Sequence, residues 1–133
     1  GPFGAVIVKE GRVIAESNNK VVLNIDPTAH AEILVIREAA RVLGTHHLDD
    51  CILYTSCEPC PMCLGAIYWS GIKRVVYASG RHDAARSGFD DELIYQEISL
   101  EPSKRQIDFS QTEDPEAVEI FRKWDNYDNK IRY

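Results

Sequence analysis

The feature of this 133-residue sequence that most limits its fold is the alternation of strand-like and helical segments. Short runs rich in β-branched and aromatic residues predict strands, and longer stretches with apolar residues three or four apart predict helices. A hairpin near the start, with a tight turn at Glu10 and Gly11, adds an antiparallel pair to strands that are joined through helices. We therefore expect an α/β fold with a mixed sheet, as a single domain over residues 1–133.

The expected elements follow the chain in a simple order. Strands are expected at residues 3–9, 12–16, 51–55 and 73–78, with a weaker candidate at 106–109. Helices are expected at residues 29–43, 59–69, 90–98 and 115–130. The polar residues 17–28 contain adjacent asparagines and an Asp-Pro pair, which is typical of a long loop.

Two short motifs stand where two of these helices begin. The first is His-Ala-Glu at residues 30–32, and the second is Pro-Cys-Pro-Met-Cys at residues 59–63. A Cys-x-x-Cys pair on the first turn of a helix directs both sulfurs to one side, and the helix N-terminus favours their thiolate forms. With an imidazole from the other helix, this predicts a metal site of His30, Cys60 and Cys63, for which soft ligands favour Zn²⁺.

Three protein ligands leave one coordination position open, which is the arrangement of catalytic zinc. Zinc lowers the pKa of water in that position from about 15.7 towards about 7, so hydroxide forms at neutral pH. Glu32 lies two residues from His30, beside the expected metal but not on it. A carboxylate there can take a proton from the water and pass it on to a departing amine, as hydrolytic deamination requires.

The four cysteines allow a second interpretation of the site. If Cys57 joined His30, Cys60 and Cys63, the four ligands would close a structural zinc site without an open position. However, Cys57 lies close before Pro59, in the expected turn between strand and helix, so its side chain is expected to point elsewhere. We interpret Cys57 and Cys51 as small buried apolar residues.

The net charge and the cysteines limit which partners the protein can bind and in which cell compartment it is expected. The net charge of −6 disfavours a large nucleic-acid substrate, which needs positive potential, and favours a small neutral ligand. The apolar runs are too short to span a membrane. Cysteines in a metal-ligand pattern are typical of a reducing compartment, so we expect a cytoplasmic protein with no membrane partner.

The motifs together resemble the cytidine-deaminase superfamily, which the His-x-Glu and Pro-Cys-x-x-Cys signatures define. The similarity is greatest to bacterial guanine deaminases, and the residues that carry it are 1–6, 26–32, 54–69, 88–91 and the terminal Tyr133. This resemblance implies a three-layer α/β/α sandwich with a mixed, mostly five-stranded sheet, and a homodimer that exchanges C-terminal segments. The helix that precedes the first strand in the family is absent from this sequence.

The resemblance also implies roles for individual residues. Glu32 is implied as the proton shuttle, and Asp91 is implied to take part in catalysis and to accept hydrogen bonds from the base. Asn19 would bind the base, and both Asp91 and Tyr133 would reach the substrate in the site of the neighbouring subunit. The other implied substrate contacts are Phe3, Ala31 and Trp69. Considered without the resemblance, the sequence favours a core position for Phe3 and Trp69, and Asp91 is compatible with a helix cap.

The function that these expectations support is hydrolysis of guanine to xanthine and ammonia. The same chemistry on adenosine in tRNA, cytosine, guanosine or an aminotriazine is the first alternative, since residues 70–74 are closer to RNA-editing adenosine deaminases. A structural zinc-binding domain without enzymatic activity is the second alternative.

Overall fold

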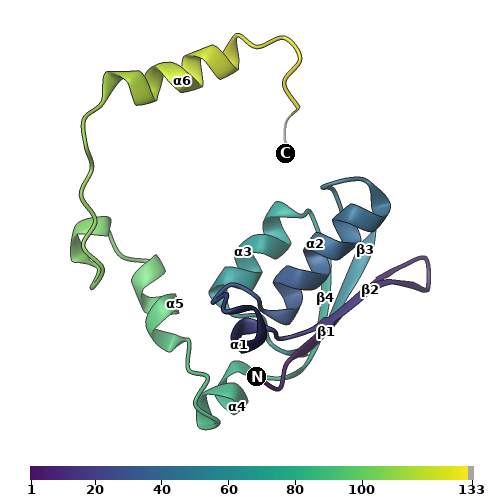
Figure 1. Cartoon of the computed structure of the whole chain (residues 1–133). Coiled ribbons are helices and arrows are strands. Elements are labelled where there is room, and N and C mark those ends of the chain that lie inside the picture. The colour runs from purple at the N-terminus through teal and green to yellow at the C-terminus, as the bar shows by residue number, and fades with distance from the viewer. Residues whose placement is uncertain (132–133) are drawn as a thin grey trace. The chain divides into compact units, whose positions relative to one another are not determined.

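The computed structural model of the chain describes residues 1–131 (Figure 1). The chain divides into two compact units, Gly1–Tyr95 and Gln96–Tyr133. The expected site residue Tyr133 lies outside the described residues. Among the described residues, no helix has the length and apolar character needed to cross a bilayer.

The first unit is built on a mixed sheet. Its strands are β1 (Gly4–Lys9), β2 (Arg12–Asn18), β3 (Cys51–Cys57) and β4 (Arg74–Ser79), in the spatial order β2-β1-β3-β4. Strand β1 pairs antiparallel with both β2 and β3, and β3 pairs parallel with β4. The expected α/β fold with a mixed sheet is confirmed, but within residues 1–131 the sheet has four strands, so the expectation of five is wrong.

Two helices cover one face of this sheet. Helix α2 (Ala31–Leu43) packs on β1 and β2, and α3 (Pro61–Trp69) lies beside it (Figure 1). The inward side chains of the sheet alternate with outward ones, as Ile7 and Leu53 show with no exposed surface. Helix α2 ends at Gly44, whose φ of 66° is a left-handed conformation that glycine adopts without strain. The core therefore lies between the sheet and these two helices.

The opposite face of the sheet keeps apolar side chains at the surface. Tyr54 and Val76, which are paired across β3 and β4, are 39% and 38% exposed. Outward residues of the neighbouring strands, such as Val13, are exposed as well. The described residues thus show one helical layer on the sheet's inner face.

Truncation of Leu53 to alanine should lower the free energy of unfolding by about 3 kcal/mol, because Leu53 is fully buried in the inner strand β3 and its loss leaves a cavity. Chemical denaturation followed by circular dichroism measures this change. As a control, Val13→Ala should change it by less than about 0.5 kcal/mol, since Val13 is 61% exposed. Equal losses from the two substitutions would contradict the assigned core.

Several expected segments differ from the observed ones. Helix α1 (Val21–Asn24) interrupts the expected loop, and α4 (Arg81–Arg86) forms where no helix is expected. Helix α4 is short and polar, so its sequence carries no apolar periodicity that would signal it. Helix α5 (Glu92–Ile98) begins two residues later than expected, because the carboxylate of Asp90 accepts the Glu92 N–H at 3.0 Å.

The second unit contains η1 (Pro102–Lys104) and α6 (Pro115–Asp125). Helix α6 begins as expected, with Asp114 accepting the Glu116 N–H, and ends at Asp125 rather than at residue 130. The expected strand at residues 106–109 is wrong, because no strand is assigned there among the described residues. The N–H of Gln106 instead donates to the Glu97 carboxylate at 2.7 Å, which replaces a ladder hydrogen bond.

Candidate metal and catalytic site

Two helix N-termini bring the predicted metal ligands together. His30 is the N-cap residue of α2 and Cys60 is the N-cap residue of α3, and both have extended backbone conformations. Pro61 occupies the first position of α3, where its missing N–H costs no helical hydrogen bond. Cys63 follows one turn into α3 and is fully buried. The ligands therefore sit on rigid element ends rather than on free loops.

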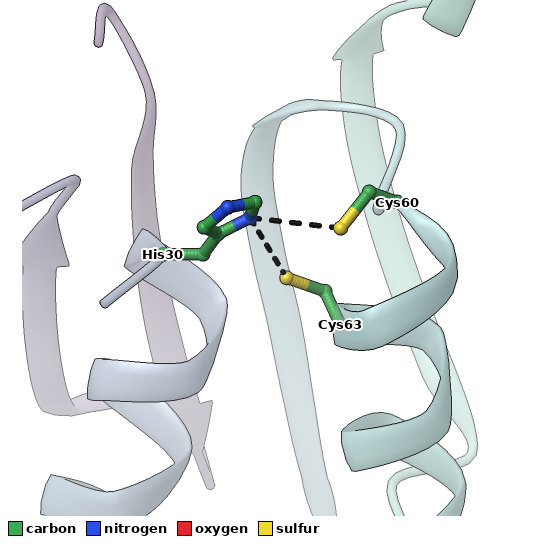
Figure 2. A group of neighbouring side chains, drawn as sticks. All are labelled: His30, Cys60 and Cys63. Atoms are coloured by element: carbon green, nitrogen blue, oxygen red, sulfur yellow. Dashed lines mark hydrogen bonds between the residues drawn. The ribbon is translucent and has the colours of Figure 1, made fainter. Parts of the chain in front are cut away.

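The three donor atoms converge on one point (Figure 2). The Nδ1 atom of His30 lies 3.5 Å from the Sγ of Cys60 and 3.5 Å from the Sγ of Cys63. All three donors lie within 4.8 Å of one another. Sulfur and nitrogen ligands of one tetrahedral zinc ion are about 3.6 Å apart, given the usual Zn–S and Zn–N bond lengths. The donor set and its spacing thus fit zinc, and the predicted trio of ligands is confirmed as a cluster.

The two thiols differ in how readily they ionise. The pKa of the Cys60 thiol is lowered to about 6, mainly by a hydrogen bond from the Cys63 side chain. Hydrogen bonds from the backbone N–H groups of Cys63 and Met62 and the charge of His30 lower it further. The pKa of Cys63 is raised, because its side chain bonds to Cys60, is buried, and lies beside the Glu32 carboxylate. A divalent cation between the ligands would offset this concentration of negative charge, which supports the same assignment.

Glu32 lies beside the cluster and is almost completely buried, with 5% of its surface exposed. Its Oε1 accepts a hydrogen bond of 2.7 Å from the hydroxyl of Thr55, in the central strand β3. Its Oε2 lies 3.5 Å from the Sγ of Cys63. The carboxylate is therefore next to the metal position and separate from the three ligands, as the sequence predicts.

A cavity of about 390 Å³ opens in front of these groups. Its size is in the range of small-molecule sites. The cavity wall combines apolar side chains with several carboxylates. The lining residues that matter for the chemistry are Phe3, Asn19, His30, Glu32, Glu58, Cys60, Arg81, Phe89, Asp90 and Asp91.

Phe3 and Asn19 line the cavity where β1 begins and β2 ends. The backbone N–H of Asn19 donates to the carbonyl oxygen of Phe3 at 2.9 Å, so the two residues are fixed to each other. The side-chain oxygen of Asn19 accepts hydrogen bonds from the amino group of Gly1 and from the N–H of Val21. The ring of Phe3 meets Phe89 edge-on, with centroids 4.9 Å apart. Phe89 is a cavity residue that the sequence prediction missed.

Asp91 lines the cavity just before α5. Burial raises the pKa of its carboxyl group, and the nearby Arg81 partly offsets this effect. The guanidinium of Arg81 lies over the Tyr95 ring, 4.6 Å from its centroid, and pairs with Glu92 at 3.3 Å. Arg81 thereby connects α4 to α5 on the cavity wall. The sequence prediction missed this residue because α4 was not recognised.

Two predicted contacts do not reach the cavity. Ala31 is fully buried in the core, since the first turn of α2 faces the sheet. Trp69 ends α3 and is 72% exposed, because the helix carries it away from the N-terminal end that faces the metal. Neither residue is among those that line the cavity in residues 1–131, and their roles as substrate contacts stay predictions.

The remaining cysteines lie apart from the metal ligands. Cys57 is 5% exposed, and its Sγ lies 3.8 Å from the carbonyl oxygen of Gly80. Cys51 is 2% exposed and belongs to the core. The cluster found among the described residues consists of His30, Cys60 and Cys63. This arrangement disfavours a closed structural site with Cys57 as the fourth ligand.

Comparison with known proteins adds to this geometry. Residues 1–79 match the model of the cytidine and deoxycytidylate deaminase zinc-binding region. A guanine deaminase from Bacillus subtilis (strain 168) is 57% identical over 133 residues, which is 100% of this chain and 85% of the relative. The X-ray structure of guanine deaminase from Bacillus subtilis superposes with a TM-score of 0.97, at the same identity and coverage.

Two further relatives match in part. A structure of a guanine deaminase from Nitrosomonas europaea has a TM-score of 0.66 and 41% identity, over 68% of this chain and 54% of that one. A tRNA-specific adenosine deaminase from Aquifex aeolicus (strain VF5) is 49% identical over 78 residues, which is 59% of this chain and 52% of the relative.

Proposed function

Because the chain belongs to the cytidine and deoxycytidylate deaminase family, we propose that it is a zinc-dependent deaminase that hydrolyses guanine to xanthine and ammonia. The observation that carries this proposal is the convergence of His30, Cys60 and Cys63 beside the buried Glu32. Its guanine specificity is supported by the identity of 57% over the whole chain to a guanine deaminase.

The chain's own residues divide the work of the reaction. Zinc held by the three ligands would supply a water molecule activated for attack at neutral pH. Glu32 accepts a proton from that water and gives it to the ring nitrogen next to the amino-bearing carbon. The carboxylate then takes the second proton of the attacking water and gives it to the amino group, and the bond from carbon to nitrogen breaks so that ammonia leaves. The buried setting of Glu32 keeps these transfers away from bulk water.

Recognition of the base is assigned to the cavity wall. The carboxylate of Asp91 accepts hydrogen bonds from the adjacent ring and amino N–H groups of guanine, a pair of donors that cytosine lacks. Asn19 offers its amide to another part of the base, and the ring of Phe3 supplies apolar contact. Glu58, Asp90 and Asp91 on the wall disfavour a polyanionic substrate such as tRNA, because like charges repel.

The assembly and location are part of the same proposal. The protein forms a homodimer, in which the C-terminal segment exchanges between subunits and brings Tyr133 to the partner's cavity. Support comes from the apolar side chains that α6 exposes, Phe121 and Ile120 among them. A helix packed on the exposed sheet face, which carries Tyr54 and Val76, would complete the three-layer sandwich. Reduced cysteines are consistent with a cytoplasmic location.

A panel of candidate substrates tests the proposed function. Ammonia release by the zinc-loaded protein is measured with guanine, guanosine, cytosine, an aminotriazine and tRNA containing adenosine. The proposal predicts turnover of guanine with kcat/KM at least about a hundred-fold above that of the others, the discrimination expected when buried polar groups read the base edge. Turnover of tRNA alone would instead assign the editing reaction, and turnover of none would favour a non-enzymatic domain.

Replacement of Asp91 by asparagine should lower kcat/KM for guanine by about a hundred-fold, because an acceptor of two hydrogen bonds becomes an uncharged amide. Steady-state kinetics with guanine measure the effect. The matched control is Asp49→Asn, since Asp49 pairs with Lys73 at the surface and does not line the cavity in the described residues. Similar kinetics for both variants would argue against a role for Asp91.

A further inference from the structure

A buried hydroxyl holds the carboxylate of Glu32. The hydroxyl of Thr55 donates to Glu32 Oε1 at 2.7 Å, and the two residues are 6% and 5% exposed. The same hydroxyl lies 3.4 Å from the carbonyl oxygen of Gly4. A threonine hydroxyl has one proton, and the shorter contact to a carboxylate is the stronger one. The proton therefore points at Glu32.

The position of this hydroxyl is fixed by the sheet. Thr55 lies in β3, and its backbone is paired with Ala5 of β1 on one side and with Tyr77 of β4 on the other. Its β-branched side chain has few rotamers to choose from. By contrast, a glutamate side chain has three torsions and, when buried without a partner, no defined orientation. The hydrogen bond from Thr55 thus restrains the Glu32 carboxylate relative to the sheet.

We propose that Thr55 is a positioning residue that holds the Glu32 carboxylate in the orientation needed for proton transfer. This inference rests on the proposed deaminase function. Thr55 is not among the residues that line the cavity in the described part of the chain. Substitution of Thr55 should therefore lower kcat, which depends on proton transfer, and leave substrate binding unchanged.

Two substitutions separate the hydroxyl from the shape of the side chain. Thr55→Val keeps the branched shape and removes the donor, whereas Thr55→Ser keeps the donor. With guanine, we expect Thr55→Val to lower kcat about ten-fold, the scale of one lost hydrogen bond to a charged group, with KM within about two-fold. Thr55→Ser should recover most of kcat. Zinc content, measured by elemental analysis, should be unchanged in both variants.

A neighbouring residue provides the matched control. Tyr54 precedes Thr55 in β3, points to the opposite face of the sheet and is 39% exposed. Tyr54→Phe also removes one hydroxyl from the strand, and it should leave kcat unchanged. In a Glu32→Gln background, Thr55→Val should cause no further loss of kcat, because the group that Thr55 positions is already inactive.

A structural readout makes the test independent of turnover. In crystal structures of the zinc-loaded variants, the Glu32 carboxylate should leave its position in Thr55→Val and keep it in Thr55→Ser. An unmoved Glu32 together with wild-type kcat in Thr55→Val would overturn the inference, as would equal losses in Thr55→Val and Thr55→Ser. If the wild-type protein fails to deaminate guanine, the proposed function fails, whereas the position of Glu32 in the variants still decides the role of Thr55.

Discussion

Glu32→Gln should lower kcat for guanine deamination by about 10⁴-fold, while the protein stays folded and keeps its zinc. Two proton transfers depend on this one carboxylate, and general acid–base catalysis contributes about 10² to 10⁴ for each positioned group. Glutamine has nearly the same shape and can still accept the hydrogen bond from Thr55, so the surroundings of residue 32 are preserved. Single-turnover ammonia release and elemental analysis measure the two parts of this prediction.

The control for this substitution lies on the same helix. Glu38 of α2 pairs with Arg41 at the surface, and Glu38→Gln should change kcat by less than about two-fold. If Glu32→Gln retained most of the wild-type turnover with zinc bound, another group would have to carry the protons. If it lost zinc instead, Glu32 would belong to the metal ligands, contrary to the arrangement of donors around His30.

Cys63→Ala should abolish both zinc binding and deamination. The substitution removes one of three ligands and leaves His30 and Cys60, which together hold zinc far less tightly. We expect less than about one tenth of the wild-type zinc content, activity near background, and a lower melting temperature, because metal binding stabilises the folded state. Elemental analysis, ammonia release and thermal unfolding measure these three effects.

The two cysteines outside the ligand cluster, Cys51 and Cys57, provide the controls for Cys63→Ala. Cys51→Ala and Cys57→Ala each remove a buried thiol that lies outside the ligand cluster, and each should retain zinc in full. Each should also lower the free energy of unfolding by about 1 kcal/mol, because a small buried group is removed. Loss of zinc from Cys57→Ala would instead support a closed site with four protein ligands. Zinc retention in Cys63→Ala would contradict the ligand set.

The metal site could be predicted from the sequence because its determinants are local. Residues at helix starts carry a recognisable signature, and Pro61 marks the first turn of α3. The burial of Cys51 and Cys57 agrees with expectation as well, and both lie on the inward side of the alternating strand β3. Within each motif, spacing along the chain places the side chains, whereas the meeting of His30 with Cys60 and Cys63 depends on contact between α2 and α3. Hence the ligands and the position of Glu32 beside them agree with expectation.

The rest of the cavity wall depends on contacts between distant segments. Arg81 reaches the site because α4 forms there. The sequence of α4 has no apolar stripe from which a helix could be predicted. Phe89 lies at the cavity because its ring contacts that of Phe3, which is 86 residues earlier in the chain. Thr55 looks like an ordinary inward strand residue until its hydroxyl is seen against Glu32. Periodicity and propensity do not specify such pairings.

The remaining differences have a similar explanation. Trp69 lies at the far end of α3 and is not among the residues that line the cavity in the described part of the chain. The expected strand at residues 106–109 has the composition of a strand, but a strand also needs a neighbour to pair with. Its Ile107 and Phe109 are 69% and 50% exposed.

The most direct test of this account is X-ray absorption spectroscopy at the zinc edge of the loaded protein in solution. The account predicts two sulfur ligands at about 2.3 Å, one imidazole nitrogen at about 2.0 Å and one further light atom that is exchangeable for solvent. Cys57→Ala should leave this spectrum unchanged. A third sulfur ligand in the wild-type spectrum, lost in Cys57→Ala, would show a closed coordination sphere and contradict the catalytic site proposed for this chain.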